Sequence, residues 1–94
     1  MSQALRNIPA SDTELREEIK RVIVDACELD IDPTSIGDND TLIGSESKLG
    51  LDSLAALQAA VALSKRFGRR IHDGNHARRV MKTVDTLAGF VRSG

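Results

Sequence analysis

The sequence is poor in aromatic residues, in cysteine and in long apolar stretches. It holds two phenylalanines and neither tyrosine nor tryptophan, which argues against a platform that stacks the bases of single-stranded nucleic acid. Its single cysteine, Cys27, excludes an intramolecular disulfide and is typical of the reducing cytoplasm, where we expect this chain. No segment approaches membrane-spanning length, and residues 1–10 lack the apolar core of a secretion signal. We therefore expect neither nucleic acid nor a membrane as a partner.

Charge is divided unequally between the two halves of the chain. Residues 1–52 hold 5 Lys+Arg and 12 Asp+Glu, a net −7, whereas residues 53–94 hold 8 and 2, a net +6. Exposed ion pairs between the halves would contribute little stability, so charge balance alone is a weak reason for this segregation. The pattern predicts a basic face within residues 65–82, which include Arg78 and Arg79.

Apolar residues recur with helical period in four stretches, the clearest being 12–29. There the spacing of Leu15, Ile19, Val22, Ile23, Ala26 and Leu29 predicts the first helix. A second helix is expected over 53–66, stopped by Gly68, a short one near 75–81 and a last one over 83–91. Residues 1–11 are expected to be flexible and residues 12–92 to form one domain.

Residues 30–51 predict a long loop, rich in Asp, Gly, Ser and Thr. Loops of this length in small domains are uncommon and usually functional. Apolar residues are spaced along it like anchors: Ile31, Ile36, Leu42, Ile43, Leu49 and Leu51. We expect Ile36, Leu42 and Leu49 to enter the core. No strand pattern is evident, so the predicted fold is all-α, a monomeric bundle of three main helices and one short helix.

The junction between this loop and the second helix reads "LGLDSL", residues 49–54. A serine at a helix start has an accessible hydroxyl, and a phosphate placed there would lie beside unpaired backbone N–H groups. The alternative is that Ser53 or Asp52 is only an N-cap. The motif resembles the modification signature of acyl carrier proteins. The order of helices and loop is similar to that family over about residues 12–92.

The resemblance implies that Ser53 receives 4′-phosphopantetheine from coenzyme A, with Asp52 as the adjacent motif residue. The arm would carry acyl groups as thioesters for fatty acid, polyketide or related specialised biosynthesis. Implied partners are a phosphopantetheinyl transferase and enzymes that ligate, transfer or condense acyl groups, while the chain itself is no enzyme. A peptidyl or aryl carrier of the same mechanism stays open, as does an unmodified helical interaction module with a basic face.

The second helix is apolar on two sides. By helical phase, Leu54, Leu57 and Val61 form one stripe, which we expect to contact partners or acyl cargo together with Arg78 and Arg79. The opposite stripe, Ala59, Leu63 and Phe67, would pack on the bundle. Its small alanines leave open either a tunnel for an acyl chain or a tightly packed small core. Leu54 to Phe67 contains no acid, unlike the acidic second helix of many acyl carrier proteins.

Other candidate sites are weaker. His72 and His76 are four residues apart, but Gly74 lies between them and no third ligand is evident, so no metal site is expected. Cys27 lies beside the core stripe of the first helix and is expected to be a small buried hydrophobe.

Overall fold

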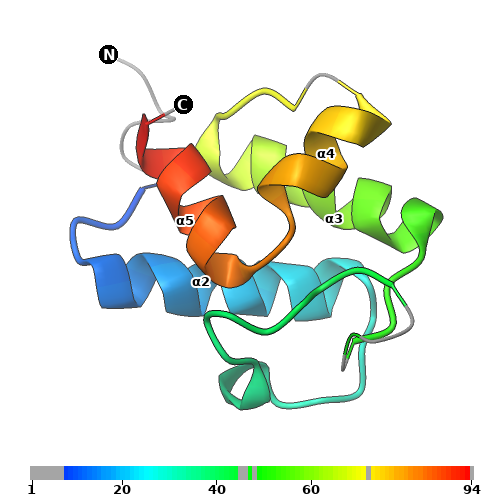
Figure 1. The fold of residues 1–94 in the computed structure, drawn as a ribbon. Helices are drawn as coiled ribbons and strands as arrows, with labels where there is room; N and C mark the ends of the chain where they lie inside the picture. The colour runs from blue at the N-terminus through cyan, green and yellow to red at the C-terminus, as the bar shows by residue number, and fades with distance from the viewer. Residues whose placement is uncertain (1–7, 45–46, 48, 72, 94) are drawn as a thin grey trace.

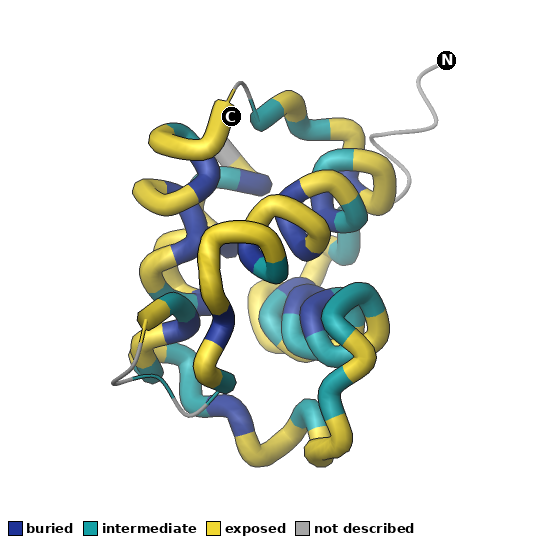
Figure 2. Tube along the Cα trace, turned by 90° about the vertical axis from the view of Figure 1, so that its right-hand side faces the viewer, coloured by how far each residue is buried: buried dark blue, intermediate teal, exposed yellow. Residues whose placement is uncertain are grey.

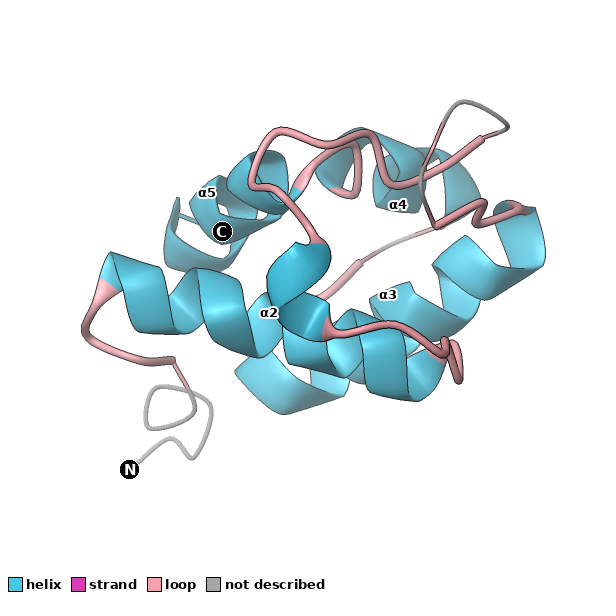
Figure 3. Cartoon of the chain, turned by 90° about the horizontal axis from the view of Figure 1, so that it is seen from below, coloured by secondary structure: helices cyan, strands magenta, loops and turns pink. Residues whose placement is uncertain are grey.

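The computed structural model describes residues 8–44, 47, 49–71 and 73–93 of the chain. Its elements are the helices α2 (Asp12–Ala26), α3 (Ser53–Phe67), α4 (Gly74–Val80) and α5 (Val84–Ser93), with a short 3-10 helix η1 (Pro33–Ser35) in the long loop. Figure 1 shows α2 along one side of the molecule, α3 and α4 across from it, and α5 between. The described residues form no strand, only an isolated bridge (Figure 3). The predicted all-α fold is confirmed.

The first helix is shorter than the sequence predicts, because it ends at Ala26 and not at Leu29. The helix stops there because Glu28, two residues beyond Ala26, has a φ of 51°, which lies in the left-handed region. The N–H groups of Glu28 and Leu29 then bond back to the carbonyls of Asp25 and Val24, at 3.2 and 2.9 Å. This is the Schellman arrangement, which usually has glycine at that position. A glutamate gives no such signal in the sequence.

The other helix ends follow local chemistry closely. Gly68, with a φ of 69°, ends α3 as predicted. At the start of α5 the Thr83 hydroxyl accepts a hydrogen bond from the Thr86 N–H at 3.0 Å, as an N-cap does. The bounds of α4 and α5 differ from the predicted ranges by one or two residues. The 3-10 helix was not predicted; its first turn is capped by Asp32, which accepts from the Thr34 N–H.

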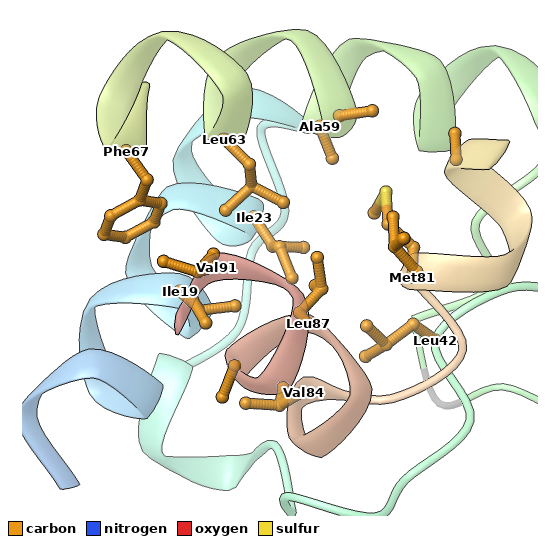
Figure 4. Close-up of a cluster of buried hydrophobic side chains, with 14 of the residues drawn as sticks. Ile19, Ile23, Leu42, Ala59, Leu63, Phe67, Met81, Val84, Leu87 and Val91 are labelled. Carbon is orange, nitrogen blue, oxygen red and sulfur yellow. The ribbon is translucent and has the colours of Figure 1, made fainter. Parts of the chain in front are cut away.

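The core lies where the inner faces of α2, α3 and α5 meet (Figures 2 and 4). From α3, Leu63 and Phe67 point toward Ile19 and Ile23 of α2 (Figure 4). The other labelled side chains of this cluster are Leu42, Ala59, Met81, Val84, Leu87 and Val91. The predicted inner stripe of α3 is therefore buried.

The long loop contributes to the same core. Ile36, Leu42 and Leu51 are buried, and Leu49 is half-buried against the cluster. The expectation that Ile31 also acts as an anchor is wrong, since its side chain is 41% exposed.

Backbone hydrogen bonds hold the loop in place. The Asp85 N–H of α5 donates to the Asp38 carbonyl of the loop at 2.9 Å. The Leu42 N–H donates to the Lys82 carbonyl at 3.1 Å, and the Gly44 N–H donates to the Leu51 carbonyl at 3.0 Å. The Ser47 hydroxyl donates to the Leu42 carbonyl at 2.7 Å, a further contact within the loop. The loop thus links the approach to α3 with the connection between α4 and α5.

Replacing Leu42 by alanine should lower the free energy of unfolding by about 2–4 kcal/mol, because the site is fully buried and a cavity would remain. Urea unfolding monitored by circular dichroism measures the change. The control is Leu54→Ala, the same truncation at an exposed position, with an expected effect within about 0.5 kcal/mol. A loss below about 0.5 kcal/mol at Leu42 would show that the loop does not contribute to the core.

Replacing Glu28 by glycine should raise the free energy of unfolding by about 0.5–1 kcal/mol. Glycine avoids the steric cost of the left-handed conformation, and this gain exceeds the added entropy of the unfolded chain. Thermal unfolding of the two proteins measures it. Glu17→Gly, the same change at an exposed position inside α2, should instead destabilise by about 1 kcal/mol. Destabilisation by both variants would contradict this account.

Candidate functional site

Ser53 is the first residue of α3, and its neighbour Asp52 is the N-cap. The Asp52 carboxylate accepts a hydrogen bond from the Ala55 N–H at 2.8 Å. Of the two N-cap alternatives, the structure therefore selects Asp52. The Ser53 hydroxyl takes no part in capping and belongs to an exposed residue.

The Ser53 hydroxyl instead accepts a hydrogen bond from a guanidinium N–H of Arg78 at 2.7 Å. Arg78 belongs to α4 and is 25 residues further along the chain. Sequence reasoning selected Arg78 for contacts with partners and did not place it beside Ser53. The buried alanines Ala56 of α3 and Ala77 of α4 line the same side of this junction, and their small side chains allow the two helices to approach closely.

The start of α4 is held by Asp73, which accepts a hydrogen bond from the His76 N–H at 2.8 Å. This backbone hydrogen bond is the main reason why the pKa of Asp73 is lowered. The His76 ring packs edge-on against Phe90, with centroids 5.4 Å apart. His72 lies outside the described residues, and those that are described contain no group of three or more potential metal ligands.

An open cavity of about 710 Å³ lies beside Ser53. Arg78 and Lys82 supply two cations to its wall and Asp52 supplies a carboxylate, while Ile43 and Leu51 supply apolar surface. The cavity lies where the backbone hydrogen bonds of the loop bring residues 42–44 against residues 51 and 82. A group attached to Ser53 could therefore contact both charged and apolar side chains of this cavity.

The outer stripe of α3 is exposed, as helical phase predicts. Leu54 is 66% exposed, Leu57 45% and Val61 47%. Arg79, also exposed, lies on the neighbouring α4. That these residues contact partners or cargo stays a prediction.

Cys27 lies close to the start of α3, a position that the sequence did not indicate. Its thiol donates to the Ala55 carbonyl at 3.4 Å, and the residue is half-buried rather than fully buried as expected. Burial raises the pKa of the Cys27 thiol, and the negative charge of Asp52 adds to the effect. The thiol is therefore kept protonated at neutral pH.

Alkylation of Cys27 by iodoacetamide at pH 8 should be slower than that of a cysteine in an unfolded peptide, because only the thiolate reacts. Its rate should rise only at more alkaline pH, since the pKa is raised. Asp52→Asn removes one of the two causes and should accelerate the reaction, whereas Asp85→Asn, a remote acid, should not. Mass spectrometry over time gives the rates; alkylation as fast as in the peptide would contradict the raised pKa.

Comparison with known proteins identifies the family. The model of the phosphopantetheine attachment site matches residues 17–91, and the chain belongs to that family. Its members carry a covalently attached 4′-phosphopantetheine, and the chain is accordingly a carrier protein that meets phosphopantetheinyl transferase and acyl-handling enzymes. No curated protein and no solved structure matches the chain significantly.

The residues at the start of α3 fit such a group. The Ser53 hydroxyl is available to form a phosphate ester, and the Arg78 guanidinium is already within hydrogen-bond distance of it. The cavity alongside combines cationic and apolar surface. Within the described part of the chain, no helix has both the length and the hydropathy needed to cross a membrane.

Proposed function

We propose that Ser53 is the residue that carries 4′-phosphopantetheine and that the chain serves as an acyl carrier. The observation that supports this most directly is the state of the Ser53 hydroxyl. It stands at the exposed start of α3, is released from capping by Asp52, and accepts a hydrogen bond from Arg78. A serine that served only to cap the helix would direct its oxygen toward the backbone N–H groups of the first turn.

Attachment requires one phosphoryl transfer. The Ser53 oxygen forms a bond to the phosphorus of coenzyme A that bears the pantetheine group. The bond from that phosphorus to the bridging oxygen of the pyrophosphate breaks, adenosine 3′,5′-bisphosphate leaves with that oxygen, and the hydroxyl proton passes to a base of the transferase. Because the serine oxygen is the acceptor toward Arg78, its own proton is free for this removal.

When bound, the arm supplies a terminal thiol that holds acyl cargo as a thioester and brings it to successive partner enzymes. The chain provides the attachment point and the recognition surface, with no catalytic residue of its own. We propose that enzymes recognise the exposed stripe of Leu54, Leu57 and Val61. Arg78 and Arg79 would lie at its rim and favour partners with acidic groups there.

The absence of any acid in α3 separates this surface from that of acidic carriers. Enzymes with basic docking patches should bind it poorly, since like charges across an interface are penalised. We therefore place the chain in a specialised pathway of acyl biosynthesis served by partners of its own. A peptidyl or aryl carrier shares this mechanism and would present the same stripe.

Incubation of the protein with coenzyme A, magnesium and a broad-specificity phosphopantetheinyl transferase should raise its intact mass by one phosphopantetheine. Ser53→Ala should abolish the gain completely, because no other residue takes its place. The control is Ser35→Ala, an exposed serine in η1, which should load like the unaltered protein. Loading of Ser53→Ala would assign another residue, and no loading of any form would favour an unmodified interaction module.

A further inference from the structure

Arg78 differs in its contact from the arginines that form ion pairs within the fold. Arg16, Arg66 and Arg92 each pair with a carboxylate, at 2.6, 3.2 and 3.2 Å. No ion pair joins Arg78 to a carboxylate among the residues that the structure describes. Its guanidinium donates instead to the neutral Ser53 hydroxyl. The Arg78 cation thus contacts the oxygen to which we propose the arm is attached. In the unmodified protein this oxygen is an uncharged acceptor and not an anion.

Asp52 and Asp73, the acids that line cavity walls together with Arg78, are engaged elsewhere. Asp52 accepts from the Ala55 N–H, and Asp73 accepts from the His76 N–H. Both carboxylates therefore serve as helix caps, which keeps them oriented toward backbone rather than toward the guanidinium. The arrangement leaves the guanidinium available for a further anion at Ser53.

We propose that Arg78 is an intramolecular phosphate-binding residue. It passes from the Ser53 hydroxyl, before attachment, to the phosphodiester after attachment, and so holds the arm over the cavity lined by Ile43, Leu51 and Lys82. The inference rests on the proposed function of Ser53.

The geometry requires little movement for this exchange. The Ser53 oxygen becomes the ester oxygen of the phosphate, so the charged phosphate oxygens lie two bonds away from the atom that Arg78 already contacts. A charged acceptor makes a stronger hydrogen bond than a hydroxyl, and the planar guanidinium can engage two phosphate oxygens at once. Lys82, on the wall of the same cavity, adds a second positive charge, which offsets the carboxylate of Asp52 on that wall.

The side on which the arm lies has a consequence for recognition. None of Leu54, Leu57 and Val61 lines this cavity, so an arm held over it leaves the exposed stripe uncovered. Ser53 and Arg78 also border a second cavity, but its wall holds Leu57 and the carboxylate of Asp73 and no lysine, so it is the less favourable side for a phosphate. Because Arg78 is exposed, the contact is weak and the arm can leave it for a partner's active site. An exposed charge pair of this kind shifts the ratio of docked to free arm by about two- to fivefold.

The test compares apo and holo protein by methyl and backbone NMR, with complete loading of Ser53 first confirmed by mass spectrometry. In the unaltered protein, attachment should shift the methyl signals of Ile43 and Leu51 and the side-chain Nε–H of Arg78. In Arg78→Gln the methyl shifts should shrink, by at most about two- to fivefold, because they follow the docked fraction of the arm. Arg79→Gln, which removes the same charge from the next position, should leave them unchanged. Arg78→Lys, which keeps the charge and loses the planar fork, should give intermediate shifts.

Two results would overturn the proposal. One is a set of attachment-dependent shifts confined to Leu54, Leu57 and Val61, which would place the arm on the stripe. The other is equal shifts in Arg78→Gln and Arg79→Gln. Failure of Ser53 to load is detected earlier, by mass, and would overturn the proposed function together with this inference. Unchanged apo spectra away from the substituted position show that each variant keeps its fold.

Discussion

The hydrogen bond from the Leu42 N–H to the Lys82 carbonyl is the constraint on which the site depends. Together with the bond from Gly44 to Leu51, it makes a short stretch of loop backbone the link between two helix junctions. Together with the bond from the Asp85 N–H to the Asp38 carbonyl and the contact of Arg78 with Ser53, this link holds the connection between α4 and α5 near the start of α3. The loop therefore stabilises the fold although its composition is polar, because its contribution comes from backbone hydrogen bonds and from a few buried side chains. The burial of Leu42 beneath this link ties it to the core.

Part of the opposite charge of the two halves is neutralised by ion pairs within the fold. Arg16, Arg66 and Arg92 each join an acid from the other half of the chain or from a distant helix. These pairs are exposed and contribute modestly, but they neutralise cations of α3 and α5 and acids of α2. Within the described part of the chain, Arg78, Arg79 and Lys82 of α4 and its C-terminal connection form no such pair. Positive charge consequently remains where α4 passes Ser53, at one edge of the exposed stripe on α3.

Much of the fold could be predicted from the sequence because its signals are local. Periodic apolar residues gave the helices, Gly68 marked the end of α3, and helical phase separated the buried and exposed stripes of α3. The end of α2 could not be predicted, because Glu28 adopts a conformation that its residue type disfavours. The contact between Arg78 and Ser53 could not be predicted either. It joins residues on different helices and depends on how the loop positions α4, for which no local pattern exists.

The position of Cys27 has a consequence for the fidelity of a carrier. With Ser53 loaded as proposed, a second sulfur would lie near the root of the arm, since the Cys27 thiol contacts the carbonyl of Ala55, two residues after Ser53. A reactive thiolate there would take the acyl group from the arm by thioester exchange, and the acyl group would then be bound to Cys27 instead of to the arm. Burial and the charge of Asp52 raise the pKa of Cys27 and suppress that side reaction. Asp52, which caps α3, thereby also reduces transfer of acyl cargo to Cys27.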